Sequence, residues 1–171
     1  HLAELSRHNF KRLNALNIQV STGSSEAYLT EMPTVDFLFL DPDRRDETGA
    51  KRIGFEYYSP NIIEQYATLL NKARLVGIKV SPMIDLSYAQ KQLPDLIRID
   101  LISVENELKE LVLWLSKDLV LVQKTLVHAF IYKNKPNQLF EVLLEENFQY
   151  AKPMLPFEEA SYLIDPAAAF L

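Results

Sequence analysis

Helical spacing of apolar residues recurs along the first part of the chain. Within residues 2–16 the Leu and Phe side chains recur at a spacing that puts them near one stripe of a helix surface, which predicts an amphipathic helix. A second helix is expected to begin at Ser24 or Ser25, a third to open at Pro60, and a short one to end before Pro94. Each is followed or preceded by a short apolar run, so helices and strands are expected to alternate.

The apolar runs between these helices are too short to be helices themselves. "NIQV" at 17–20 predicts a short strand, while "VDFLFL" at 35–40 and "RLVGIKV" at 74–80 are almost wholly apolar, as in strands covered on both faces. Such a succession of strands and helices predicts an α/β fold, with a mostly parallel sheet and helices on both of its faces.

After Ile97 the pattern changes to strict alternation. "IRIDLISV" and "LVLWL" flank "ENELKE", which predicts a long antiparallel hairpin at the C-terminal end of this sheet. The stretch from 119 to 148 predicts more strands, with "KNKPNQ" at 133–138 as a turn.

Composition narrows the class of protein. The chain has 171 residues and 48% hydrophobic content, which suits one domain with a real core. It contains no apolar run of about 18 residues and no signal-peptide pattern, so we expect a cytoplasmic protein without a membrane partner. The absence of Cys excludes disulfides, thiolate zinc sites and cysteine nucleophiles. The net charge of -5 argues against a generally basic nucleic-acid surface, but not against a local basic patch.

Three polar loops follow the predicted strands. They are "STGSSE" at 21–26, "DPDRRDE" at 41–47 and "SPMID" at 81–85. Because the carboxyl ends of parallel strands meet at one edge of a sheet, we expect Gly23, Asp41 and Ser81 to open onto a shared cleft.

The second loop admits more than one interpretation. Its cations, with Lys51 and Arg52 nearby, suit phosphates or a nucleic-acid backbone, but its own acidic residues could equally neutralise them, or the loop could be a solvated Asp-Pro turn. Asp41 and Asp43 also match the nucleophile and acid of a haloacid dehalogenase-type phosphatase, with Ser81 as the hydroxyl. The further Lys and acidic pair which that enzyme needs for magnesium are missing, and no metal site is expected at His1, His8 or His128.

The order of these pieces resembles the latter part of a class I S-adenosylmethionine-dependent methyltransferase, whose domain is Rossmann-like. Within that superfamily it is most similar to the bacterial methyltransferases with a THUMP-like domain. Residues 7–116 carry the resemblance, in the stretches "RHNFKRLNALNIQVSTGSSEAYL", "DFLFLDPDRRDETGAKR", "GIKVSPMIDLSYAQKQLP" and "ISVENELKELVLWL". The resemblance implies a partial methyltransferase domain at 1–116, additional strands packed on or continuing it at 117–150, and a linker or the start of a THUMP-like module at 151–171, where "YLIDPAAAFL" lies.

The resemblance also implies roles for single residues. Residues implied to lie near the cofactor are Gly23, Ser24, Ser25 and Asp41, although an acidic residue often stands where this chain has Ser24. Asp41 and Pro42 would begin the catalytic motif, in which a polar acceptor and a backbone carbonyl hold an exocyclic amine. Residues implied to contact the substrate are Asp43, Arg44, Arg45, Ser81 and Pro82.

Two departures from the family pattern restrict this chemistry. Asp43 and Arg44 stand where amino-group methyltransferases have Pro and an aromatic residue, so this loop cannot stack a base in the usual way. "DPDRR" is also similar to the Asp-Pro-Pro-Arg motif of RNA uracil-5-methyltransferases. Those enzymes need a cysteine where this chain has Ser81, so attack on a pyrimidine carbon is excluded.

The resemblance implies an S-adenosylmethionine-dependent methyltransferase acting on structured RNA, either tRNA or rRNA. The strands and the glycine-rich loop that complete the cofactor site are expected to precede His1, so this chain alone should bind the cofactor poorly. The alternative is a noncatalytic RNA- or protein-binding module on a methyltransferase-like fold. Sheet edges left exposed by the missing strands could pair copies of the chain.

Overall fold

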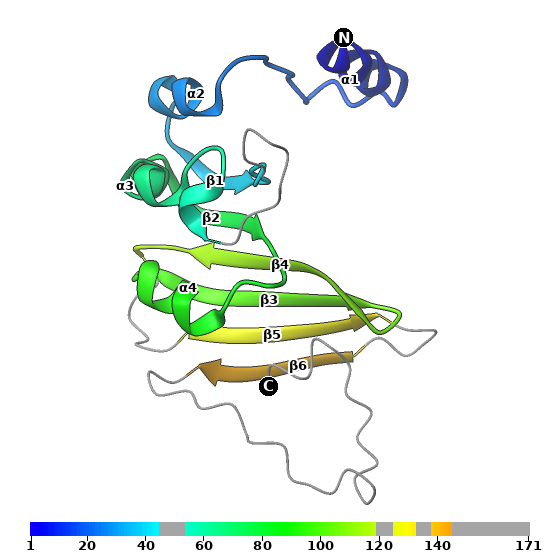
Figure 1. Cartoon of the computed structure of the whole chain (residues 1–171). Coiled ribbons are helices and arrows are strands. Elements are labelled where there is room, and N and C mark those ends of the chain that lie inside the picture. The colour runs from blue at the N-terminus through cyan, green and yellow to red at the C-terminus, as the bar shows by residue number, and fades with distance from the viewer. Residues whose placement is uncertain (45–53, 119–124, 133–137, 145–171) are drawn as a thin grey trace, which may run out of the picture. The chain divides into compact units, whose positions relative to one another are not determined.

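The computed structural model describes residues 1–44, 54–118, 125–132 and 138–144 (Figure 1). The chain forms two compact units, the first from His1 to Met32 and the second from Pro33 onward.

The first unit holds two helices, α1 (Leu2–Arg12) and α2 (Ser25–Glu31). The predicted helix at 2–16 is real but ends earlier, because Asn14 adopts a left-handed φ of 55°. Ser24 is the N-cap of α2, and its Oγ accepts a hydrogen bond from the Ala27 N–H at 3.2 Å, which confirms the predicted helix start.

The strand predicted at 17–20 is wrong. Asn17 lies in a turn, and residues 18–20 belong to no helix or strand. The Val20 carbonyl accepts a hydrogen bond from the Arg7 side chain, with Nη2 at 2.9 Å, instead of joining a sheet. A four-residue run with two polar members offers too little apolar surface to fix a strand without a neighbour.

The second unit is built on a six-stranded sheet in the order β1-β2-β4-β3-β5-β6. The strands are β1 (Val35–Leu40), β2 (Ala73–Val80), β3 (Leu96–Val104), β4 (Glu107–Leu115), β5 (Thr125–Tyr132) and β6 (Gln138–Leu144). The α/β class is confirmed, but the sheet is mixed and not mostly parallel: β1–β2 and β3–β5 are parallel, and the other three pairings are antiparallel. The hairpin causes the difference, since it inserts β4 between β2 and β3.

The predicted hairpin is present, with a shorter turn than expected. Only Glu105 and Asn106 lie between β3 and β4, and their φ values of 49° and 64° are those of a two-residue turn with both central residues left-handed. The turn predicted at 133–138 lies outside the described residues, apart from Gln138, which begins β6.

Two helices and one 3₁₀ turn pack with the sheet: η1 (Phe55–Tyr57), α3 (Ile62–Lys72) and α4 (Leu86–Gln92). Pro60 does not open α3 as predicted, because Asn61 is the N-cap and its side chain accepts from the Ile63 and Glu64 N–H groups. The helix predicted to end before Pro94 is confirmed as α4, with the Asp85 side chain accepting from the Tyr88 N–H at 2.7 Å.

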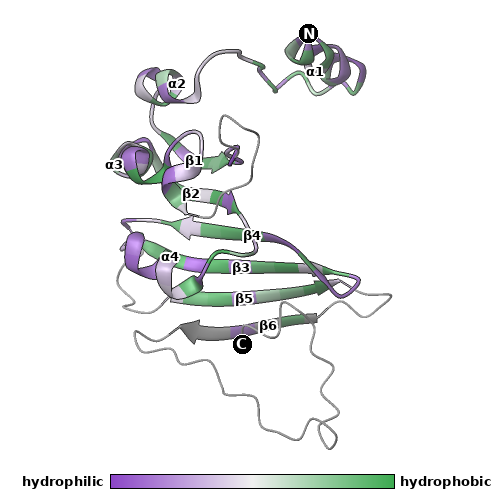
Figure 2. Cartoon of the chain, in the orientation of Figure 1, coloured by the Kyte–Doolittle hydropathy of each residue, from purple (hydrophilic) through white to green (hydrophobic). Residues whose placement is uncertain are grey.

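The two faces of the sheet differ in burial. One face holds fully buried aliphatic side chains from β2, β4, β3 and β5, namely Val76, Ile78, Leu111, Leu113, Leu115, Ile99, Leu101 and Val127. Figure 2 shows this hydrophobic character along the strands. The other face carries Trp114, with Phe37 stacked on it at 5.8 Å, and Gly77 leaves room there for the Trp114 and Phe39 rings.

The prediction that strand 35–40 is covered on both faces is wrong for the described residues. Phe37 and Phe39 are 49% and 48% exposed, because β1 is the edge strand of the described sheet. The expected helices on both faces stay a prediction, since α1 and α2 belong to the other unit. Among the described residues no helix is long and apolar enough to cross a membrane.

Candidate functional site

A polar cleft opens at the carboxyl ends of β1 and β2. The parallel register pairs Leu40 with Ile78, so the loops after both strands leave from the same end of the sheet. The cleft has a volume of about 460 Å³. Its lining comes from the two loops, from the end of β2, from β4 and from Tyr58, and consists of Asp41, Pro42, Asp43, Arg44, Tyr58, Lys79, Val80, Ser81, Pro82, Lys109 and Glu110. Asp41 and Ser81 therefore share a cleft, as their positions in the sequence indicate.

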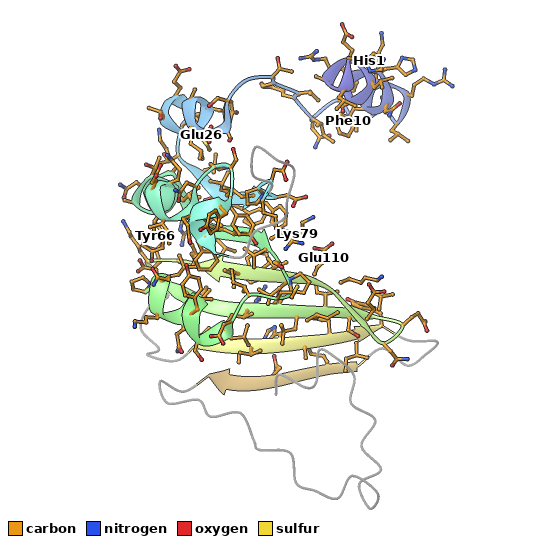
Figure 3. All side chains as sticks on the ribbon, viewed as in Figure 1. His1, Phe10, Glu26, Tyr66, Lys79 and Glu110 are labelled. Carbon is orange, nitrogen blue, oxygen red and sulfur yellow. The ribbon has the colours of Figure 1, made fainter. Side chains whose placement is uncertain are left out.

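Asp41 is paired with a lysine from the neighbouring strand. Lys79 Nζ lies 2.7 Å from Asp41 Oδ2 and 3.8 Å from Glu110 Oε2 of β4. Figure 3 shows Lys79 and Glu110 close to each other near the ends of their strands. The hydrogen bond to Asp41 raises the pKa of the Lys79 ammonium and the charge of Glu110 adds to this, while partial burial works against it.

The Ser81 side chain is buried, so its hydroxyl is not exposed to the cleft. It is 2% exposed, its Oγ accepts from the Met83 N–H at 3.2 Å, and its own N–H donates to the Tyr58 hydroxyl at 2.8 Å. Burial raises the pKa of that Tyr58 hydroxyl, with the Ser81 N–H and the Arg44 charge acting in the opposite direction. The Ser81 carbonyl also accepts from the Ile84 N–H at 3.1 Å, so both backbone polar groups of Ser81 are bonded within the chain, and the implied substrate contacts of Ser81 and the half-buried Pro82 stay a prediction.

Asp43 shapes the loop that begins at Asp41. Its N–H donates to the Ser59 carbonyl at 3.2 Å and its carbonyl accepts from the Ser59 N–H at 2.7 Å, while its Oδ1 accepts from the Arg44 N–H at 2.8 Å. Pro42 is buried beside it, and Arg44 is half-buried on the cleft wall. Arg45, also implied to contact the substrate, lies outside the described residues, as do Lys51 and Arg52.

Three of the four residues implied to lie near the cofactor, Gly23, Ser24 and Ser25, line a pocket within the first unit, whereas the fourth, Asp41, lines the cleft of the second unit. The pocket has a volume of about 550 Å³, and its lining includes Gly23, Ser24, Ser25 and Tyr28. Both serine hydroxyls donate to Glu26 Oε2, from Ser24 at 2.7 Å and from Ser25 at 3.2 Å, and the Ser24 bond in particular lowers the pKa of Glu26. A cleft shared by Gly23 and Asp41 stays a prediction, because the two residues belong to different units.

The sequence interpretation missed Lys79, Glu110 and Tyr58. One signal for Lys79 was available, since it is a charged residue inside the apolar run 74–80, one position before the strand ends. Such a residue usually faces the sheet edge or an acidic partner. Its partners could not be read from spacing, because Glu110 reaches the cleft only through the antiparallel register that pairs Lys79 with Val112.

Comparisons with known proteins point to one class of fold. A scan against family models and a search of curated proteins found no match. Among solved structures, the chain is similar to a protein from Porphyromonas gingivalis W83 described as a "putative methyltransferase", with a TM-score of 0.70 and 25% sequence identity. The match covers 89% of this chain and 39% of that protein, so this chain spans less than half of its neighbour's length. Its fold is similar to that of a methyltransferase.

Proposed function

We propose that this chain is part of an S-adenosylmethionine-dependent methyltransferase of the bacterial THUMP-like type, which transfers a methyl group to an amino nitrogen of structured RNA. The observation that carries the proposal is the structural likeness to a methyltransferase over 89% of the chain. The position of Asp41 and Pro42 supports it, because ligands of such sheets bind beyond the carboxyl ends of the strands.

The pocket around Gly23 fits a cofactor in size. At about 550 Å³ it falls in the usual range of ligand sites, and a side-chain carbon added at Gly23 would meet nothing within 4 Å. Gly23 and Tyr28 would hold the cofactor there through backbone and ring surface, since the Ser24 and Ser25 hydroxyls are already bonded to Glu26. When bound, S-adenosylmethionine supplies an electrophilic methyl group.

The role proposed for Asp41 is to hold the acceptor. Its carboxylate is 59% exposed on the cleft and accepts a hydrogen bond from the substrate's amino group. This orients the nitrogen lone pair for an in-line displacement, in which positioning supplies most of the rate enhancement. Arg44, and Arg45 after it, would bind phosphates of the RNA, so that the contact with nucleic acid is local on a chain of net charge -5.

The experiment measures transfer of a tritiated methyl group from S-adenosylmethionine to purified tRNA and rRNA by the complete protein. Asp41→Asn is expected to lower the transfer rate by about 100-fold, because the neutral amide oxygen accepts a weaker hydrogen bond from the amine than the charged carboxylate does. Asp36→Asn is the matched control: this aspartate is exposed in β1, the strand that Asp41 follows, and its substitution should leave the rate unchanged. Full activity of Asp41→Asn would contradict the proposed role.

The noncatalytic binding module remains a second candidate, favoured by Asp43 and Arg44 at the positions where a base-stacking pair would stand. Calorimetry separates the two. The enzyme proposal expects binding of S-adenosylmethionine by the complete protein and little binding by the 171-residue chain. RNA binding by a complete protein that does not bind the cofactor would instead support the module.

A further inference from the structure

Lys79 connects two elements that are far apart in the sequence. It lies in β2, between the loop after β1 on one side and β4 on the other. Its ammonium contacts Asp41 at 2.7 Å and Glu110 at 3.8 Å, and one third of its side chain is exposed. Lys79 is therefore held from both sides at the floor of the cleft.

The contact with Lys79 fixes one oxygen of Asp41. It involves Oδ2, and among the described residues no other side chain forms a hydrogen bond or ion pair with this carboxylate. The backbone beside it is already anchored, by burial of Pro42 and by the paired bonds between Asp43 and Ser59. With the backbone anchored, the Asp41 carboxylate can move mainly by rotation of its side chain, and the contact with Lys79 restricts that rotation.

We propose that Lys79 is a positioning residue for Asp41: it binds Oδ2, which leaves Oδ1 for the amino group of the acceptor, and Glu110 keeps the ammonium in place. This inference rests on the proposed function. A carboxylate held in one orientation keeps the acceptor aligned, whereas a freely rotating one does so only part of the time.

The contact itself is tested without activity, on the 171-residue chain. NMR titration of the Lys79 side chain should give a pKa above the ordinary 10.5, and Asp41→Asn should lower it more than Glu110→Gln does, because the Asp41 hydrogen bond is the larger cause. A larger effect of Glu110→Gln, or no effect of either change, would overturn the arrangement.

The positioning role is tested in the complete protein with the same methyl-transfer assay. Lys79→Met should lower kcat about 10- to 100-fold with the KM for S-adenosylmethionine unchanged, and Lys79→Arg should recover activity to within roughly fivefold of wild type. Lys91→Met, an exposed lysine in the last turn of α4, is the matched control. Urea unfolding of each variant separates a loss of positioning from a loss of folded protein.

The outcomes separate the two proposals. Wild-type kcat in folded Lys79→Met, together with a defect in Asp41→Asn, would overturn the positioning role and leave the proposed function standing. A wild-type protein that neither binds S-adenosylmethionine nor transfers methyl groups would overturn both.

Discussion

The carboxylate of Asp100 lies at the centre of a polar cluster on the aromatic face of the sheet. Trp114 Nε1 donates to its Oδ2 at 2.7 Å, and Arg98 Nη2 donates to the same oxygen at 3.2 Å, while the Arg98 guanidinium also lies 4.6 Å from the centre of the Trp114 ring. His128 lies between Asp100, 3.6 Å away, and Glu141, 2.9 Å away. One buried carboxylate thus links β3, β4 and β5.

Removing the Asp100 carboxylate should destabilise the folded protein. Asp100→Ala leaves the Trp114 N–H and the Arg98 guanidinium without their acceptor, and we expect the free energy of unfolding to fall by about 3 kcal/mol. Urea denaturation measures this. Asp118→Ala is the control, since its ion pair with Arg74 is mostly exposed and should contribute less than about 1 kcal/mol. Equal effects of the two substitutions would contradict the central role of Asp100.

At the scale of elements, the β3–β4 hairpin is the feature that distinguishes this sheet from a parallel one. Its turn places Glu105 in a left-handed conformation that is unfavourable for a residue of this type, whereas Asn106 tolerates it better. The Glu105 N–H donates to the Tyr132 carbonyl at 3.0 Å, so the turn is also tied to the end of β5.

The sequence of this turn can be improved. The double change Glu105→Asn with Asn106→Gly provides the pair preferred in such turns, and we expect it to raise the free energy of unfolding by about 1 kcal/mol. Glu105→Val should act in the opposite direction, because a β-branched side chain strains a φ of 49°. Thermal unfolding of both proteins checks the sign of each effect, and stabilisation by valine would show that the turn is not strained.

Elements with strong local signals were predictable from the sequence. The apolar period identifies α3 and the strands at 35–40 and 74–80, although the cap of α3 was misplaced. The stop before Pro94 identifies α4, and alternation identifies the hairpin. The position of Asp41 and Ser81 on one cleft follows from strand ends alone. The sequence carries a signal for Lys79, but it could not predict the contacts of Lys79, Glu110 and Tyr58, because these depend on which segments are neighbours and in what register.

At the scale of the whole molecule, most of the buried apolar side chains belong to the second unit. No residue of 1–20 is buried in the described structure, whereas fully buried aliphatic side chains lie on β2, β3, β4 and β5. The first twenty residues thus contribute no buried side chain to the described structure.

Deletion of residues 1–20 should therefore change stability little. We expect the free energy of unfolding to stay within about 1 kcal/mol of the intact chain, because surface changes away from the core are small. Urea denaturation followed by far-ultraviolet circular dichroism measures this, with the Leu113→Ala substitution in the core as a destabilising reference of about 3 kcal/mol. A loss on deletion as large as that of the reference would show that the helix α1 supports the fold.

The order of strands also sets a sequence of events during synthesis. Asp41 follows β1 and Lys79 lies in β2, and both strands precede β4, which supplies Glu110 and lies beside β2 only after the chain has passed through β3 and turned back. A nascent chain released up to Leu93 has both residues of the Lys79–Asp41 contact but not the strand that supplies Glu110. The strand that supplies Glu110 is therefore available to the cleft only once residues up to about Leu115 have emerged from the ribosome.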